Sequence, residues 1–189
     1  MVTSTKIEAR ELRKKYNGKE VVKGVSLTVS GGEIVGLLGP NGAGKTTTFS
    51  MIAGFVAPTG GTLLLNDQSI VHLPPYKRAR KGLVYLSQEA SVFRSLTVEE
   101  NIRAIAQTLR GDRKSEDEIV QQRMEQLGIE RLAGQKANTL SGGERRRLEI
   151  ARALVLSPDF LLLDEPFSGV DPKSVSEVSE IINSLKSNG

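Results

Sequence analysis

Hydrophobic and polar positions alternate with a period of about two in the first part of the chain. Ile7–Leu12 alternates weakly and Val25–Val29 strictly, as expected for strands with one buried face. Glu33–Leu38 is instead a nearly continuous apolar run, which is typical of a strand covered on both faces. Gly61–Asp67 and Gly82–Leu86 predict two further strands.

The pattern becomes helical after Thr97. Apolar residues then recur at intervals of three, four and seven, and the polar stretch Gly111–Ser115 divides them into two segments. We interpret Thr97–Leu127 as a separate helical lobe. Its apolar positions are Val98, Ile102, Ile105 and Leu109 in the first helix, and Val120, Met124 and Leu127 in the second.

The last third of the chain predicts a helix, a buried strand and another helix. The first helix extends from about Gly142 to Leu156, and the strand is Phe160–Leu163. The final helix begins at Asp171-Pro172, with proline in its first turn. Strands that alternate with helices indicate a mostly parallel α/β sheet, which binds ligands at the carboxyl ends of its strands. The apolar stripe of the final helix consists of Val175, Val178, Ile181, Ile182 and Leu185.

Composition excludes several kinds of site. The 189 residues contain no cysteine and one histidine, so a disulfide framework and a multi-histidine metal site are excluded. The net charge of +4 permits an anionic partner without identifying one. There is no signal pattern at the N-terminus and no apolar run of about 20 residues, so we expect a soluble cytoplasmic chain.

Gly39–Thr46 fits the phosphate-binding pattern G-x-x-x-x-G-K-[ST] in full. A predicted strand leads into it and a predicted helix, Lys45–Ala53, leads out. Glycines let the backbone curl with its N–H groups toward phosphate oxygens, and the helix N-terminus adds partial positive charge. Lys45 is placed to reach the β- and γ-phosphates and Thr46 to ligate Mg²⁺. The alternative interpretation is a glycine-rich surface turn.

Two acids, Asp164 and Glu165, follow the apolar strand Phe160–Leu163. Asp164 is placed to hold the Mg²⁺ shell through water, and Glu165 could polarise the attacking water. The alternative interpretation is an N-capping acid pair in a strand-to-loop turn.

Leu140–Glu144 opens the next helix, with Ser141 as N-cap and Glu144 completing a capping box. Two glycines in a first turn cost helix propensity, and they let a phosphate approach the helix N-terminus. Because the chain already has one phosphate-binding terminus, this second one suggests a site completed by another molecule.

These segments resemble the ABC ATPases. Leu140–Glu144 is similar to their signature segment, Gly39–Thr46 to their phosphate loop and Phe160–Glu165 to their magnesium strand with its catalytic glutamate. Three more elements match in order: Tyr16, similar to the aromatic residue that stacks on adenine; Gln88, similar to the glutamine that contacts Mg²⁺ and the attacking water; and Ser168–Asp171, similar to the loop that crosses the dimer interface.

The resemblance implies a P-loop NTPase fold of the α/β class. Its core sheet is mostly parallel, with an N-terminal antiparallel β subdomain and a helical subdomain. We expect residues 1–94 and 157–189 to form the core with the β subdomain, and residues 95–156 the helical subdomain with the signature helix.

The resemblance also implies ATP and Mg²⁺ as cofactors and assigns the site. Glu165, Gln88 and Lys45 would be catalytic, and Thr46, Gln88 and Asp164 would bind the metal. The nucleotide-binding residues would be Tyr16, Gly39, Pro40, Asn41, Gly42, Ala43, Gly44, Lys45, Thr46, Thr47, Ser141, Gly142 and Gly143.

Two further segments, Ser87–Arg94 and Ser141–Leu154, look like those of the lipopolysaccharide-export ATP-binding proteins. Gly36–Phe49 is similar to these proteins and also to branched-chain amino-acid importers. Export of lipopolysaccharide from the inner membrane is therefore the expected function, with another ABC transporter as the alternative. A soluble ABC protein acting on ribosomes or DNA, and a nucleotide-binding remnant without a motor role, stay open.

The expected partners follow from the family. The resemblance implies a head-to-tail homodimer, closed by ATP, in which Ser141 and Gly143 of one copy face the phosphate loop of the other. Transmembrane permease subunits would dock near Gln88–Arg94, with Phe93 and Arg94 as candidate contacts, and no nucleic acid is expected. The chain would then lie in the cytoplasm, peripheral on the inner face of the inner membrane.

One element of the family is missing from the sequence. ABC ATPases carry a switch histidine after the next strand, whereas the sequence stops at Ser187-Asn188-Gly189, a helix-end signal. His72 lies too early to replace it, so we interpret it as a surface-loop residue and expect a truncated chain, without its C-terminal part, that binds ATP but hydrolyses it poorly. Arg145, Arg146 and Arg147 are interpreted as a solvated helix face near the signature, not a nucleic-acid patch.

Overall fold

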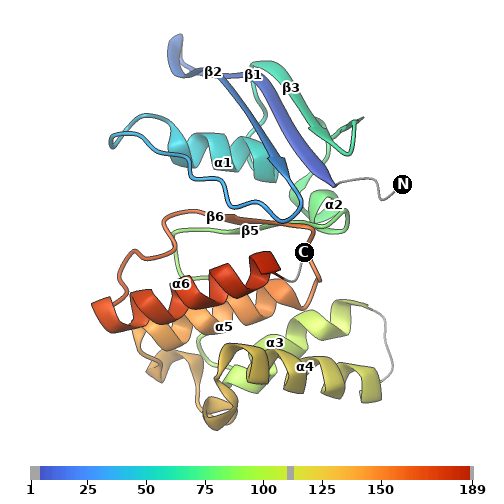
Figure 1. Ribbon diagram of the computed structural model, residues 1–189, viewed down its shortest axis with the longest axis vertical. Helices are drawn as coiled ribbons and strands as arrows, with labels where there is room; N and C mark the ends of the chain where they lie inside the picture. Colours follow the sequence, from blue (N-terminus) through green and yellow to red (C-terminus); the bar gives the residue numbers. More distant parts are fainter. Residues whose placement is uncertain (1–4, 110–112, 188–189) are drawn as a thin grey trace. The chain divides into compact units, whose positions relative to one another are not determined.

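The computed structural model describes residues 5–109 and 113–187 (Figure 1). They fall into two compact units, one formed by residues 5–84 and 186–187 and the other by residues 85–109 and 113–185. Part of the polar stretch Gly111–Ser115 and the expected helix end at Asn188-Gly189 lie outside the described residues. From Arg113 onward the stretch belongs to a helix.

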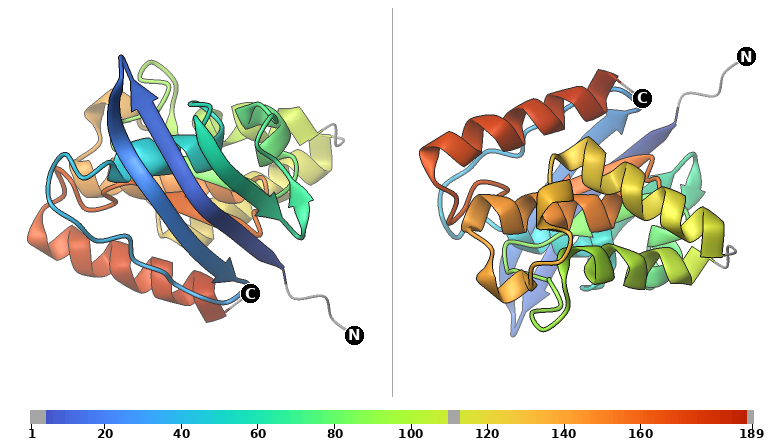
Figure 2. Two further views of the ribbon diagram at one scale, coloured as in Figure 1. Left: turned by 90° about the horizontal axis from the view of Figure 1, so that it is seen from above. Right: turned by 90° about the horizontal axis from the view of Figure 1, so that it is seen from below.

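The first unit is an antiparallel sheet with the helix α1 packed against it, as Figures 1 and 2 both show. The strands lie in the order β2-β1-β3-β4. Their bounds are Lys6–Tyr16 for β1, Lys19–Ser30 for β2, Gly60–Leu65 for β3 and Gln68–Ser69 for β4. The helices are α1, Lys45–Ala53, and the short α2, Pro75–Ala79. The expected antiparallel β subdomain is thus confirmed.

The hairpin of β1 and β2 follows directly from its sequence. Its two turn residues, Asn17 and Gly18, both have positive φ, the conformation of the tight turns that match strand twist. Within β1, Ile7 and Ala9 point into the core, and an irregularity at Glu11, with φ 50°, moves Leu12 onto the same buried face.

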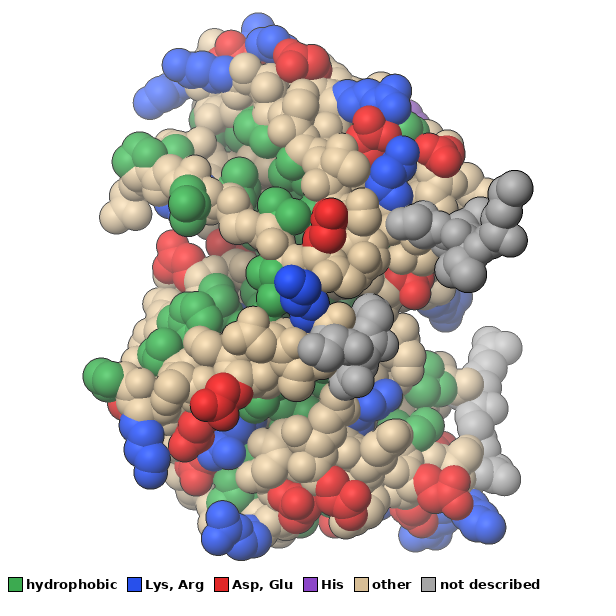
Figure 3. Space-filling model, in the orientation of Figure 1, with side chains coloured by type: hydrophobic (Ala, Val, Ile, Leu, Met, Phe, Trp, Pro, Cys, Tyr) green, Lys and Arg blue, Asp and Glu red, His purple; other side chains and the backbone are tan. Residues whose placement is uncertain are grey.

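The predicted strand Glu33–Leu38 is wrong. No helix or strand is formed over these residues, and Ile34, Val35 and Leu38 are 53%, 51% and 92% exposed. Figure 3 shows apolar side chains among the charged ones at the molecular surface. An apolar run forms a strand only where neighbouring strands supply hydrogen bonds, and no described strand pairs with this one.

The second unit combines helices with the sheet β5-β6. The strands are β5, Leu83–Leu86, which begins in the first unit, and β6, Phe160–Leu163. The α-helices are α3, Val98–Ala106; α4, Arg113–Leu127; α5, Gly142–Leu154; and α6, Pro172–Ser187. Three 3₁₀ turns lie between them: η1, Gln107–Leu109; η2, Glu130–Leu132; and η3, Ala137–Thr139. Helices α3, α4 and α5 pack on one another, around Ile102, Met124 and Leu148.

Six of the twelve apolar positions predicted for the helices of this unit are buried and five are half-buried, whereas the twelfth, Leu109, is exposed. It is 43% exposed because the α-helix ends at Ala106 and gives way to η1, which changes the direction of the side chain. Within the described part of the chain, none of the helices combines the length and apolarity that crossing a membrane requires.

A buried arginine holds the end of α1. Arg78, on α2, is 1% exposed, and its guanidinium donates to the carbonyls of Met51 and Ile52 in the last turn of α1. It also donates to the carbonyls of Val71 and Leu73 in the preceding loop. Burial lowers the pKa of Arg78 to about 10, so the side chain keeps its charge at neutral pH.

Replacing Arg78 by methionine should lower the free energy of unfolding by about 2–4 kcal/mol, because buried carbonyls without a donor cost about 1–3 kcal/mol each before relaxation. Urea unfolding measures this change. Arg80→Met, at an exposed position two residues further on, is the matched control and should change stability by no more than about 0.5 kcal/mol. Equal losses in both variants would contradict the role given to Arg78.

Candidate functional site

The phosphate loop Gly39–Thr46 leads into α1, as predicted. The Lys45 ammonium donates to the carbonyls of Gly39 and Pro40, at 2.7 and 3.0 Å, so the side chain folds back over the loop. Thr46 and Thr47 lie in the first turn of the helix. The loop thus gathers a cation, two hydroxyls and a helix N-terminus, which together suit an anionic phosphate.

Gly44 is required by backbone geometry. Its φ of 87° lies in the left-handed region, and a Cβ at this position would lie 2.8 Å from the carbonyl oxygen of Val21 on β2. The buried Thr48 then closes the first turn, because both its N–H and its hydroxyl donate to the Gly44 carbonyl. The glycine therefore fixes how the loop enters the helix.

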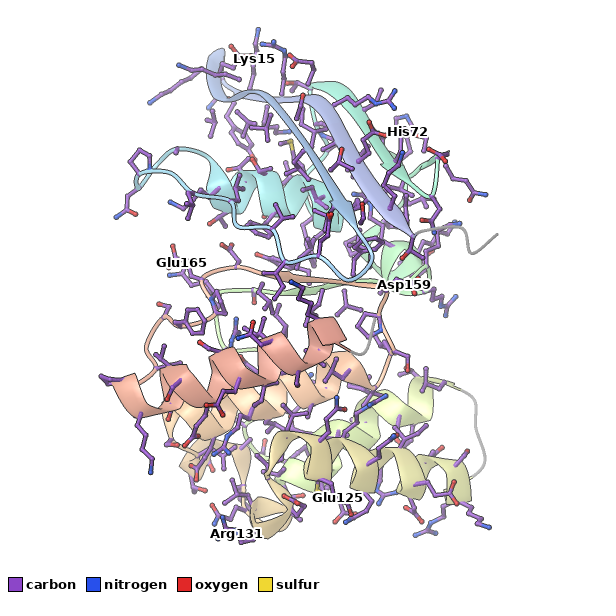
Figure 4. The ribbon with its side chains drawn as sticks, viewed as in Figure 1. Lys15, His72, Glu125, Arg131, Asp159 and Glu165 are labelled. Carbon is purple, nitrogen blue, oxygen red and sulfur yellow. The ribbon has the colours of Figure 1, made fainter. Side chains whose placement is uncertain are left out.

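The two acids after β6 lie in different environments. Asp164 is 2% exposed, and the Tyr85 hydroxyl lies 3.2 Å from its Oδ2. Its N–H also donates to the Leu86 carbonyl of β5. Glu165, labelled in Figure 4, is exposed and has a left-handed backbone with φ 46°. Such a conformation is disfavoured for glutamate, and residues strained in this way are enriched at functional sites.

The signature glycines of α5 pack against the loop Ser168–Asp171 and the first turn of α6 in the same chain. A Cβ on Gly142 would lie 2.6 Å from the Gly169 carbonyl oxygen, and one on Gly143 would fall on the Ser174 side chain. The Ser174 hydroxyl in turn donates to Asp171 at 2.6 Å, which lowers the pKa of Asp171. From the sequence, an approaching phosphate is the expected reason for both glycines. The structure adds a second cause, close packing within the chain.

The predicted capping box is confirmed. The Ser141 hydroxyl accepts from the Glu144 N–H, and the Glu144 carboxylate accepts from the Ser141 N–H at 2.8 Å. These interactions with the Ser141 side chain and backbone lower the pKa of Glu144.

Arg146 is not part of a solvated face. It is 6% exposed and pairs with the buried Glu149 one turn further along α5, whereas Arg145 and Arg147 are half-buried. The spacing of three between opposite charges in the sequence was a signal for this pair.

Gln88 is exposed on the segment 87–96, which connects β5 to α3. The same segment lines a hollow of about 280 Å³ in the second unit, and Phe93 is 46% exposed. The lining residues are Ala90, Val92, Arg94, Ala137, Asn138 and Arg145.

Tyr16 and His72 are both exposed side chains of the first unit. Tyr16 ends β1, where it is 44% exposed, and the Lys14 ammonium lies 4.9 Å from the centre of its ring. His72 is exposed in the loop between β4 and α2, as predicted (Figure 4).

The comparisons with known proteins agree with these motifs. A profile described as "ABC transporter" matches residues 22–168, and the chain therefore belongs to the ABC transporter family, as an ATP-hydrolysing subunit. An ATPase of this family binds a nucleotide and works with partner subunits in a membrane.

Several relatives are similar along nearly the whole chain. The "Lipopolysaccharide export system ATP-binding protein LptB" of Escherichia coli (strain K12) is 51% identical over 185 residues, which are 97% of this chain and 76% of the relative. The protein of the same name from Haemophilus influenzae is 48% identical over 188 residues, with the same shares of both chains.

Solved structures share the fold. The ADP conformation of an ATP-binding cassette from an ABC transporter has a TM-score of 0.84 at 27% identity, covering 98% of this chain and 78% of that one. The cbiO1 protein from Clostridium perfringens, part of the ABC transporter complex cbiONQ, has a TM-score of 0.87 at 27% identity, covering 96% and 74%.

The packing of Gly143 on Ser174 can be tested by second-site rescue. Gly143→Ala should lower the free energy of unfolding by about 1–3 kcal/mol, because the added methyl overpacks a filled space. Ser174→Gly in the same chain should restore most of the loss, and Ser174→Gly alone is the control. In urea unfolding, a double variant no more stable than Gly143→Ala would contradict the contact.

Proposed function

We propose that the chain powers the export of lipopolysaccharide by binding and hydrolysing Mg²⁺-ATP. The observation that carries the nucleotide chemistry is the Lys45 ammonium held over the loop Gly39–Thr46 at the start of α1. The cargo is supported by the names of relatives that are 48–51% identical over 97% of the chain.

In this proposal the phosphates bind to the loop and to Lys45, Thr46 and Thr47. Backbone N–H groups and the helix dipole attract the negative charge, and the lysine takes the place of a counterion. Tyr16 offers an exposed ring face for the adenine.

Magnesium would be held by Thr46, Gln88 and Asp164. These residues offer one hydroxyl, one amide and one carboxylate group, so the protein would supply few oxygens. That suits Mg²⁺, which keeps several waters and takes its remaining ligands from phosphate. When bound, the ion would neutralise charge on the phosphates. Asp164, buried and next to the Tyr85 hydroxyl, supplies a hard oxygen ligand.

Hydrolysis needs a base near the attacking water. We assign this role to Glu165, whose exposed carboxylate follows directly on Asp164 and whose backbone is held in a disfavoured conformation. Gln88 would orient the same water.

The active form in this proposal is a head-to-tail homodimer. Ser141, Gly142 and Gly143 at the start of α5 would complete the phosphate site of a second copy. A capped helix N-terminus supports this role, because its partial positive charge suits the γ-phosphate.

The transmembrane partner would dock in the hollow beside Phe93 and hold the chain, from the cytoplasm, at the inner face of the inner membrane. Small apolar residues form part of the hollow, and Arg94 and Arg145 make its rim positive. A short partner segment with an acidic side chain fits this chemistry.

Glu165→Gln should lower steady-state ATP hydrolysis by about 10²–10⁴-fold, because the base is lost while the phosphate loop is intact. ATP would still bind, so the variant should accumulate as an ATP-dependent dimer, detected by light scattering after size exclusion. Glu180→Gln, exposed on α6, is the matched control and should hydrolyse ATP at the rate of the parent chain and stay monomeric between turnovers. A monomeric Glu165→Gln protein that binds ATP would argue against the homodimer.

The cargo and the docking hollow can be tested together in Escherichia coli depleted of its own lipopolysaccharide export ATP-binding protein. The chain should restore lipopolysaccharide at the cell surface. Arg94→Glu should reduce export by about tenfold or more, because charge reversal repels an acidic partner segment.

The matched control for Arg94→Glu is Arg131→Glu, at the exposed turn labelled in Figure 4, which should export normally. An active ATPase that fails to restore export would leave the enzyme class intact and reject this cargo.

A further inference from the structure

The segment 87–96, which carries Gln88, has no helix or strand of its own. A backbone without a hydrogen-bonded ladder takes its conformation from whatever pairs with its N–H and carbonyl groups. In this segment those partners are side chains of α5 and α3, together with the main-chain N–H groups of Asn138 and Ala137, which donate to the carbonyls of Arg94 and Leu96.

Three side chains of α5 bind the part of the segment around Gln88. The Glu149 carboxylate accepts from the Ser91 N–H at 2.9 Å. Arg146 donates to the Ser87 carbonyl at 3.3 Å, and Arg152 donates to the Ser91 carbonyl. Gln88 therefore lies on a short stretch that is attached on both sides to the same helix.

The far end of the segment is held by α3. Asn101 is fully buried, accepts from the Phe93 N–H at 2.8 Å and donates to the Phe93 carbonyl at 3.0 Å. The Arg152 guanidinium also lies 4.5 Å from the centre of the Phe93 ring. The attachment from α5 thus extends to the exposed aromatic residue beside the hollow.

The charges in this attachment are buried. Arg146 and Glu149 are 6% and 4% exposed and lie 2.9 Å apart, and Arg146 Nε and Nη2 have no hydrogen-bond partner among the described residues. An incompletely paired buried ion pair contributes little to net stability compared with an apolar pair of the same size. Its clear effect is to fix one conformation of the main chain of Ser87 and Ser91.

We propose that Arg146, Glu149 and Arg152 are positioning residues, which make the segment carrying Gln88 follow the helix that begins at the signature motif. Movement of α5 then displaces Gln88 and Phe93 together. The proposal rests on the proposed function, since it acts through the role given there to Gln88. The inference extends the proposed function by naming the side chains that determine the position of Gln88.

Glu149→Gln tests the proposal, because the substitution keeps the shape of the side chain and removes its charge from Arg146. The turnover number kcat should fall by about tenfold or more, whereas the Kd for ATP, which depends on the phosphate loop, should change less than twofold. Arg152→Gln, at a half-buried position, should lower kcat in the same way without endangering the fold.

The matched control is Glu99→Gln, which breaks an ion pair with Arg103 on the surface of α3 and should leave kcat unchanged. A fall of kcat, ATP affinity and unfolding free energy in parallel would mean that Glu149 is only structural, and would overturn the proposal.

A second readout does not depend on hydrolysis. The chain has no cysteine, so a spin label on Ala90→Cys reports this segment alone. The label should become more mobile when Glu149→Gln or Arg152→Gln is added, and should not respond to Glu99→Gln. An unchanged spectrum would overturn the proposal. If the parent chain hydrolyses no ATP but the spectrum changes, the attachment stands and the proposed function fails.

Discussion

The helix α1 depends on cations that bind main-chain oxygens at both of its ends. At its C-terminal end the last carbonyls face the interior of the first unit, where a carbonyl without a donor is costly, and Arg78 supplies that donor. At its N-terminal end Lys45 binds the carbonyls of Gly39 and Pro40. Gly44 and Gly54, the residues that flank α1, both have left-handed backbones, which allow the chain to turn at each end of the helix. The conformation of the phosphate loop therefore depends on the contacts that hold α1 in place.

Local patterns predicted most of the elements. The strand Phe160–Leu163 and the helix starting at Gly142 were recognised from hydropathy, capping residues and period, which are properties of the segment itself. The strand predicted at Glu33–Leu38 was wrong because strand formation depends on partners elsewhere, which no local pattern contains. The same limit explains why the expected mostly parallel core sheet is represented, among the described residues, by β5 and β6.

In the candidate site, too, residues within local motifs were predicted, whereas residues that depend on distant partners were not. Contiguous motifs with a chemical reason predicted Lys45, Asp164, Glu165 and Ser141, and the family resemblance predicted Gln88. The side chains that hold these motifs were missed or misjudged: Arg78 went unnoticed, and Arg146 was taken for a solvent-facing residue. Both side chains donate to main-chain carbonyls that are distant in sequence. Every residue has a main-chain carbonyl, so the residue types in the sequence do not indicate which carbonyl an arginine will bind.

At Glu165, the residue that would be best for stability differs from the residue that the proposed catalysis requires, because the backbone there is left-handed. A φ of 46° costs a residue such as glutamate roughly 1 kcal/mol or more, whereas glycine adopts it freely and asparagine at a lower cost. Selection for stability alone would therefore favour replacing this glutamate, and would do so at the residue proposed to be the base. A substitution at this position that raises the stability of the protein would therefore remove the proposed base and its activity. High thermal stability in a variant would not indicate that the variant hydrolyses ATP.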